Sequence, residues 1–374
     1  MKQDIKFRNS FILLVLLTTS ILACKTAAER RDTFKIIGHI EGLKSDSVYL
    51  YNTISNQMQG TAVNEGDFLI TGKVIYPEMY QLYFDVALTK FKDLFLENSA
   101  ITINGNIDSL ENIQIKGSAS NVEYLEYRDN TQKVRKDYYK LDSILSVAMD
   151  NLQYEMADSI ELLATAAAHR VLECAYKYAL EHKKSVILPY ITYMSCLNAP
   201  DKSIANKMVD LIQPGQIKSA RIDALNKMFA DMERTSVGSV APDFEMTGMN
   251  GRKIKLSSYK GKVVLLDFWA SWCNPCIKGF PELEEVYKKF KNDKFEIIGF
   301  SIDKDKAAWE KSLAKYHLPW PQVVELNGAQ TGAPKEYGIL FIPATYLIDK
   351  DGKIAGKNLH GKKLLNRITP LINE

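Results

Sequence analysis

The pattern of apolar and polar positions changes twice along the chain, and each part predicts a different structure. From 33 to 117, short segments alternate in polarity or are rich in β-branched and aromatic residues, which is typical of half-buried strands. Turn residues separate them at intervals of roughly 8–12 residues, as in a β-sandwich. The predicted strands are 34–40, 47–51, 67–70, 79–84 and 101–105. We therefore expect an all-β, sandwich-like N-terminal domain over 33–117.

Between 121 and 234 the apolar residues recur at steps of three and four, which predicts helices. One such row is Leu141, Ile144, Leu145, Ala148 and Leu152. The segment 235–239 is mostly small and polar, and it reads as a linker. The middle of the chain is thus predicted to be a helical region that ends before this linker.

From 238 to 374 apolar strand-like runs alternate with helical patterns, which predicts an α/β domain. The predicted helices are 273–291, 306–316 and 362–372. The predicted strands are 244–246, 253–256, 263–268, 295–301, 323–325, 344–348 and 353–356.

The length and composition of the chain suggest several folded domains. The chain has 374 residues, 46% of them apolar and 25% charged, which suggests two or three domains at roughly 150 residues each. With 48 basic and 45 acidic residues the net charge is +3, so the charge balance gives no reason to expect nucleic-acid binding.

The first 24 residues are predicted to be an export signal rather than part of the fold. Lys2, Lys6 and Arg8 precede an apolar run at 11–23, which is too short to span a bilayer but suits a signal-peptide core. The run ends in ILAC at 21–24, which resembles the bacterial lipobox and implies a lipid on Cys24. The predicted location is the periplasmic side of a bacterial envelope membrane, with a lipid anchor. A plainly cleaved signal with an incidental cysteine is the alternative.

Two of the remaining four cysteines form a candidate redox pair. Cys273 and Cys276 follow an apolar strand and open a helix, so they lie on one face, and the free N–H groups of the helix favour a thiolate on the first. No further cysteine or histidine pair lies nearby to complete the four ligands of a structural zinc site, so we expect no metal and no cofactor. Cys174 and Cys196, in the helical region, are read as inert thiols, with a disulfide between them left open.

Residues 263–276 read VVLLDFWASWCNPC and resemble the strand-to-helix turn of the thioredoxin superfamily. The runs APDF at 241–244, LSSYKGK at 256–262 and FIPATYLID at 341–349 are similar to the TlpA/ResA-like thiol-disulfide oxidoreductases of the bacterial periplasm. The resemblance covers about 240–374 and implies a central mixed sheet flanked by helices. The N-terminal half resembles the β-rich extension of many Bacteroidetes members.

The resemblance implies a role for each cysteine. Cys273, nearest the helix N-terminus, would be the reachable attacking thiolate, and Cys276, one turn further, the buried resolving thiol. Pro275 suits an early helical position, because its missing N–H would lack a partner there, and it stiffens the loop.

The resemblance also implies four supporting residues. Pro343 matches the cis-proline that faces the disulfide, and the backbone of Ile342 would pair with the substrate chain. Trp272 would shield the thiols and contact partner proteins. Asp267 matches the buried acid that helps to move the proton of the resolving thiol, and burial would favour its neutral form.

Two residues depart from the family pattern. Gly279 stands where the branch that matures cytochrome c has a glutamate, so a part in cytochrome c biogenesis does not follow from the resemblance. Gly299 stands where thioredoxins have a lysine near the buried acid, which weakens the inference for Asp267. The dithiol chemistry needs neither residue.

The preferred prediction is an exported protein-disulfide reductase. Its partners would be protein thiols and disulfides and a membrane electron donor of the thiol-disulfide type. It has no histidine beside Cys273 that would over-stabilise the thiolate, so reduction is favoured over oxidation.

Two alternatives remain open at this stage. A peroxiredoxin-like thiol peroxidase would need a hydroxyl residue and a proline where this chain has Ala270 and Leu266. The chain would instead be a binding or docking protein if its N-terminal half carried the main function.

Overall fold

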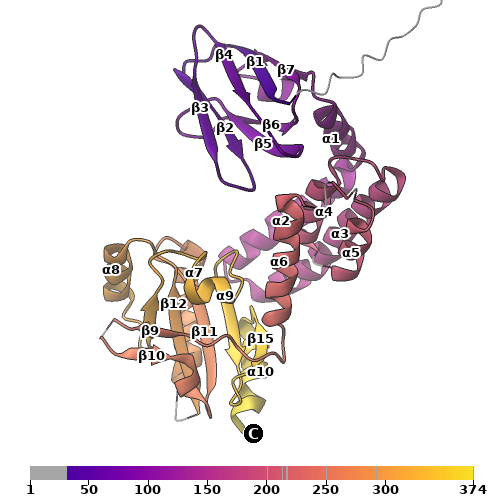
Figure 1. Cartoon of the computed structure of the whole chain (residues 1–374). Coiled ribbons are helices and arrows are strands. Elements are labelled where there is room, and N and C mark those ends of the chain that lie inside the picture. Colours follow the sequence, from indigo (N-terminus) through magenta and orange to yellow (C-terminus); the bar gives the residue numbers. More distant parts are fainter. Residues whose placement is uncertain are drawn as a thin grey trace, which may run out of the picture.

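A computed structural model describes residues 32–199, 201–212, 214–215, 218–249, 251–291 and 294–373. Three parts follow one another in sequence and are stacked in that order in Figure 1: a β part, a helical part and an α/β part. The predicted signal segment and Cys24 lie outside the described residues. None of the helices in these ranges is both long and apolar enough to cross a bilayer.

The β part is built from two four-stranded sheets that share one core. Its strands are β1 (Phe34–Glu41), β2 (Ser47–Asn52), β3 (Met58–Ala62), β4 (Asp67–Gly72), β5 (Glu78–Tyr83), β6 (Phe91–Leu96), β7 (Ala100–Asn106) and β8 (Gln114–Lys116). The sheets have the orders β4-β1-β7-β8 and β3-β2-β5-β6, and β1 and β7 pair in parallel. Alternate residues of β1 are buried, as its sequence pattern predicts. The sandwich-like prediction is confirmed.

The helical part follows directly. Its helices are α1 (Ala119–Asn130), α2 (Gln132–Asp150), α3 (Tyr154–Glu181), α4 (Leu188–Asn198), α5 (Lys202–Val209) and α6 (Ala220–Arg234). Side chains accept hydrogen bonds from free backbone N–H groups at the starts of α1, α5 and α6, where Ser118, Asp201 and Ser219 are the N-caps. Helices α2 and α3 form an antiparallel hairpin that reaches the α/β part.

One buried side chain ties the β part to the helices. Arg221 of α6 forms an ion pair with Glu78 of β5, with 3.1 Å between Nε and Oε1, and it donates a hydrogen bond to Thr53. Its guanidinium also lies over the rings of Tyr190 and Tyr193, 5.2 and 5.3 Å from their centroids. Because the Arg221 side chain is only 4% exposed, these contacts hold the two parts together away from solvent.

The α/β part contains a five-stranded mixed sheet. Its elements are β9 (Glu245–Thr247), β10 (Lys253–Lys255), β11 (Val263–Trp269), α7 (Asn274–Phe290), β12 (Phe295–Ser301), α8 (Lys306–Tyr316), β13 (Gln322–Val324), α9 (Gly332–Glu336), β14 (Ala344–Ile348), β15 (Ile354–Lys357) and α10 (Gly361–Asn373). The strand order is β13-β12-β11-β14-β15, with β11 parallel to β12 and antiparallel to β14. The predicted thioredoxin-like architecture is confirmed.

One prediction in the helical region was wrong. Leu152 was placed in a row of helical core positions, but α2 ends at Asp150 and Leu152 has a positive φ of 56°. The backbone N–H of Leu152 donates to the carbonyl of Met149, and that of Gln153 donates to the carbonyl of Ala148. These two bonds form a Schellman motif, which ends the helix at Asp150, two residues before Leu152.

Candidate active site

The sequence places the two cysteines at the junction between the central strand and a helix. All seven residues of β11 are buried, and α7 begins immediately after Cys273, which is its N-cap. The Sγ of Cys273 accepts a hydrogen bond from the backbone N–H of Cys276 at 3.2 Å. A sulfur in this position receives the free N–H groups of the helix, which stabilise the thiolate when the pair is reduced.

The structure joins Cys273 to Cys276 in a disulfide, with 5.3 Å between the two Cα atoms. Their exposed fractions are nearly equal, 4% for Cys273 and 5% for Cys276. The expectation that the first thiol is the more reachable one is therefore not met in this oxidised form. Both cysteines belong to an apolar cluster with Trp269, Phe280 and Trp309.

A buried carboxylate fixes the turn that carries Cys273. Asp303 accepts hydrogen bonds from the backbone N–H and the hydroxyl of Ser271, at 2.8 and 2.6 Å, and from the hydroxyl of Ser301. Sequence reasoning missed Asp303, because only tertiary structure brings the end of β12 to this turn. The contacts hold the residues before the disulfide in one conformation.

The bond between Ile342 and Pro343 is cis, and both residues line the same cavity as Cys276. Next to them Trp272 and Phe341 are 65% and 82% exposed, so the rim of the site presents aromatic surface to solvent. The structure thus brings Ile342, Pro343 and Cys276 together and leaves Trp272 beside them on the surface.

Asp267 lies on β11, is 4% exposed, and lines the same cavity as Cys276. Burial raises the pKa of its carboxyl group to about 7. A carboxyl group with such a pKa exchanges a proton near neutral pH, as the sequence analysis expected. The assigned role in catalysis stays a prediction.

The two glycines that depart from the family pattern, Gly299 and Gly279, lie in different surroundings. Gly299 lies opposite Asp267 in the β11–β12 register, and the side chain of Gln322 fills the space where a Cβ would point. The amide oxygen of Gln322 accepts a hydrogen bond from the indole N–H of Trp269. Gly279, in contrast, faces open space and lines the cavity.

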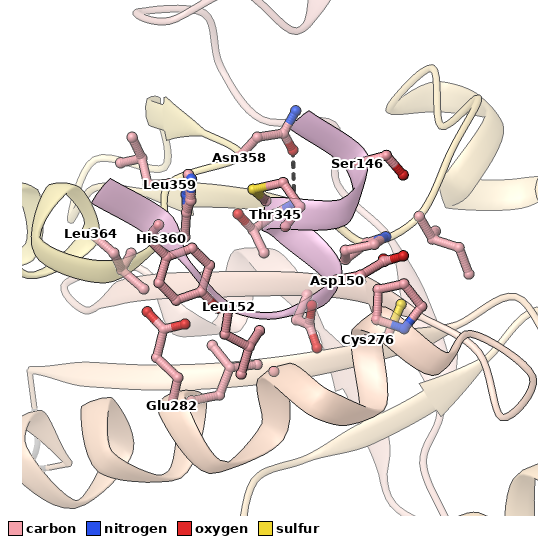
Figure 2. Close-up of a pocket in the computed structure, with 18 residues that line it drawn as sticks. Ser146, Asp150, Leu152, Cys276, Glu282, Thr345, Asn358, Leu359, His360 and Leu364 are labelled. Carbon is pink, nitrogen blue, oxygen red and sulfur yellow. Dashed lines mark hydrogen bonds between the residues drawn. The ribbon is translucent and has the colours of Figure 1, made fainter. Parts of the chain in front are cut away.

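A cavity of about 370 Å³ extends from the disulfide along α7. Figure 2 shows that its two sides come from different parts of the chain, with Ser146, Asp150 and Leu152 of the α2–α3 hairpin across from Cys276 and Glu282 of α7. The segment 358–360 after β15 closes one end. No sequence signal placed this hairpin at the site, because its contacts join residues more than a hundred positions apart.

Polar groups at the closed end connect the hairpin to the α/β part. The ring of Tyr154 stacks edge-on against that of His360, with 4.6 Å between centroids. Burial and then a hydrogen bond to Glu282 raise the pKa of the Tyr154 hydroxyl, and burial lowers the pKa of His360. Glu282 also accepts a hydrogen bond from the backbone N–H of Gly361 at 2.6 Å.

The other two cysteines lie outside this site. Cys174 and Cys196 are free thiols of the helical part, so no disulfide joins them. Cys196 is buried, and burial raises its pKa to about 12. Across the described residues, no three acidic, histidine or cysteine side chains are grouped in a way that could hold a metal ion.

Comparisons with known proteins agree with this division of the chain. The AhpC/TSA family model matches residues 237–357, and the model of a domain of unknown function, DUF4369, matches residues 34–124. The thiol-disulfide oxidoreductase ResA of Bacillus cereus is 38% identical over 126 residues, which cover 34% of this chain and 71% of that protein. The chain belongs to the ResA family of thiol-disulfide oxidoreductases.

A further ResA relative and a solved structure match a similar share of this chain. ResA of Bacillus subtilis is 37% identical over 129 residues, which cover 34% of this chain and 70% of that protein. A solved thiol-disulfide oxidoreductase from Bacteroides fragilis is 34% identical, with a TM-score of 0.34, and the match covers 36% of this chain and 99% of that one. The family model, which matches residues 237–357, places the ResA-like part of the chain in the α/β part, and the α2–α3 hairpin lies outside that match.

Proposed function

We propose that this ResA-family enzyme reduces disulfide bonds in proteins through the Cys273–Cys276 pair. The observation that carries the proposal is the disulfide at the start of α7, whose Cys273 sulfur receives a backbone N–H, beside the cis bond that precedes Pro343. A helix N-terminus favours the thiolate, and the backbone of Ile342, before the cis bond, is the segment that we propose pairs with the substrate chain.

The reaction takes place in two exchange steps. The Cys273 thiolate attacks one sulfur of the substrate disulfide, forms a mixed disulfide and releases the other substrate sulfur as a thiolate. The Cys276 thiolate then attacks the sulfur of Cys273, which releases the substrate's second thiolate and closes the Cys273–Cys276 disulfide. Two electrons pass from the dithiol to the substrate. The oxidised enzyme then requires a dithiol donor, which we assign to a membrane protein.

Trapping tests this order of attack. In Cys276→Ser the second step is blocked, so the substrate protein should remain bonded to Cys273 and appear on non-reducing gels as an adduct that dithiothreitol releases. The double variant of Cys276→Ser with Cys273→Ser should give no adduct. The double variant of Cys276→Ser with Cys196→Ser should give the same adduct as Cys276→Ser alone. An adduct that survives loss of Cys273 would refute the assignment.

The direction of electron flow has its own test. Equilibrium titration against glutathione or dithiothreitol should give a potential nearer thioredoxin's, about −270 mV, than that of DsbA, about −120 mV. A value near the DsbA potential would make the chain an oxidase instead. Hydrogen peroxide consumption that depends on Cys273 and outpaces disulfide reduction would favour the peroxidase alternative.

We also propose that the enzyme acts outside the cytoplasm, anchored by a lipid on Cys24. The support is the basic start, the apolar run at 11–23 and the lipobox-like ILAC. In the membrane fraction, the mature protein should begin at Cys24, and its mass should include that of the attached acyl groups. Cys24→Ser should release the protein from that fraction, and a chain that stays membrane-bound would count against the anchor.

A further inference from the structure

The cavity beside the disulfide is formed jointly by the ResA-like part and by the α2–α3 hairpin. Met149, Asp150, Leu152 and Tyr154 line it from the hairpin, and Figure 2 shows this helical wall lying over α7. The opposite wall contains Cys276 of the redox pair, together with Asp267, Ile342 and Pro343. Any group that enters the cavity therefore lies within reach of the redox site and of the hairpin at once.

Several polar contacts hold the hairpin against this wall. Lys278 of α7 donates a hydrogen bond to the backbone carbonyl of Asp150 at 2.9 Å. At the start of α10, Lys363 pairs with Asp158 of α3 at 2.6 Å. The ring contact between Tyr154 and His360 adds to these pairs. The tip is thus positioned from the α/β part as well as by its own helices.

The hairpin tip carries an apolar side chain at a position that favours glycine. Leu152 is the residue after the C-cap in the Schellman motif, and its φ of 56° is in the left-handed region. Glycine is the usual residue there, because a Cβ costs free energy in that conformation. The half-buried Leu152 side chain instead lines the cavity. The backbone therefore carries strain at a turn that lines the cavity, and strained residues cluster at functional sites.

The chemistry of the lining selects what can bind. Leu152 is joined by the apolar side chains of Met149, Leu283, Leu359 and Leu364. The described lining residues include carboxyl groups, among them Glu282 and Asp150, and they include no lysine or arginine. An apolar group is favoured in such a cavity, and an anion is disfavoured by charge repulsion.

We propose that this cavity binds an apolar side chain adjacent to the reactive cysteine of the substrate polypeptide, and that Leu152 determines this specificity. The inference rests on the proposed reduction of protein disulfides. A volume of about 370 Å³ is at the small end of the ~300–1,000 Å³ range of ligand pockets, which suits a side chain and not a folded element. The helical part thereby contributes to substrate choice, although the two cysteines that react lie in the α/β part.

Two peptide disulfides test the proposal with the full-length reduced enzyme. Each is a blocked pentapeptide, glycine-X-cysteine-X-glycine, bonded through its cysteine to 2-mercaptoethanol, with leucine or aspartate as X. Stopped-flow rates are divided by the rate of the same protein with 2-hydroxyethyl disulfide, a neutral compound without side chains. The wild type should prefer the leucine peptide by about tenfold or more.

Leu152→Gly and Leu152→Asn both suit the left-handed backbone but remove the apolar wall. Each should fold with a melting temperature no lower than that of the wild type, and each should lower the leucine-to-aspartate rate ratio by about fivefold to tenfold. Val147→Ala is the matched control, because Val147 is on the same hairpin, 55% exposed, and does not line the cavity. It should keep the wild-type ratio.

Equal wild-type rates for the two peptides would overturn the inference, as would a ratio unchanged in both Leu152 variants. Such results would leave the proposed function standing, provided that 2-hydroxyethyl disulfide is reduced and that Cys273→Ser abolishes the reaction. If the wild type reduces none of the three disulfides, the proposed function itself fails, and the inference fails with it.

Discussion

Asp267 shows most clearly how a single side chain connects stability with chemistry. Its carboxyl group has a pKa of about 7 in the folded chain because burial disfavours the charged form, whereas an unfolded aspartate titrates near 3.9. Between these values the folded state binds more protons than the unfolded state. The free energy of unfolding must therefore fall as pH rises through this window.

Replacing Asp267 by asparagine removes this cost. At pH 8 the Asp267→Asn variant should be more stable than the wild type, by at most about 4 kcal/mol from a difference of roughly three pH units. The gain should fall to about 0.5 kcal/mol at pH 4, where the carboxyl group is protonated in the folded state and about half protonated in the unfolded chain. Thermal melts at both pH values measure it.

The same substitution should slow the second exchange step if Asp267 moves the proton of Cys276. Stopped-flow measurement of mixed-disulfide decay separates this effect from the gain in stability. Unchanged decay would remove Asp267 from the mechanism while leaving the stability argument intact.

At the scale of single elements, periodic patterns predicted most helices and strands, and the exceptions have physical causes. β11 and β12 read as buried apolar runs, and their predicted positions agree with the structure within a residue. β3 is almost entirely exposed and β6 is buried only at its end, so neither has the alternation that marks a strand. α9 spans five residues, too few for a helical period.

The residues of the active site likewise form two groups, one that local sequence identifies and one that only tertiary structure brings together. Cys273, Cys276, Pro275 and Asp267 lie on one strand-to-helix unit, and local sequence is enough to place them. Leu152 and Asp303 reach the site through tertiary packing alone, and no periodicity could assign them to it. The cis state of the bond before Pro343 is likewise set by the fold, although its motif suggested it.

Helix α7 offers a prediction at this scale. Gly279 lies inside the helix, and no atom is within 4 Å of the position that a Cβ would occupy. Gly279→Ala should therefore raise the free energy of unfolding by about 0.5–1 kcal/mol, because alanine is the better helix former. Denaturation followed by circular dichroism measures this.

Gly299→Ala is the contrasting control, since its Cβ would collide with the side chain of Gln322 beside a buried hydrogen bond. That variant should be less stable than the wild type. A loss of stability in Gly279→Ala would show that the space beside α7 is filled.

At the scale of the whole molecule, the buried ion pair between Arg221 and Glu78 is one of the contacts that attach the β part to the helices. Arg221→Ala leaves Glu78 without its cation in a buried setting and also removes the contacts with Tyr190 and Tyr193. We expect a loss of about 3–5 kcal/mol, because an unpaired buried charge is costly. Calorimetry of the full chain should show a lower melting temperature.

Lys202→Ala is the matched surface substitution. Lys202 pairs with Glu233, but the two side chains are 49% and 65% exposed, so its loss should cost no more than about 1 kcal/mol. Equal effects of the two variants would mean that Arg221 does not join the parts.

Of the two free cysteines in the helical part, Cys196 is the buried one, and it lies in a protein that we propose exchanges disulfides. With a pKa near 12 this group is almost never ionised at neutral pH, and the helices around it keep other sulfurs away. It cannot intercept a client held at Cys273 or pair with it by mistake. This buried thiol therefore does not interfere with the catalytic cycle, and partial unfolding of the helical part would expose it to the disulfides that the enzyme handles.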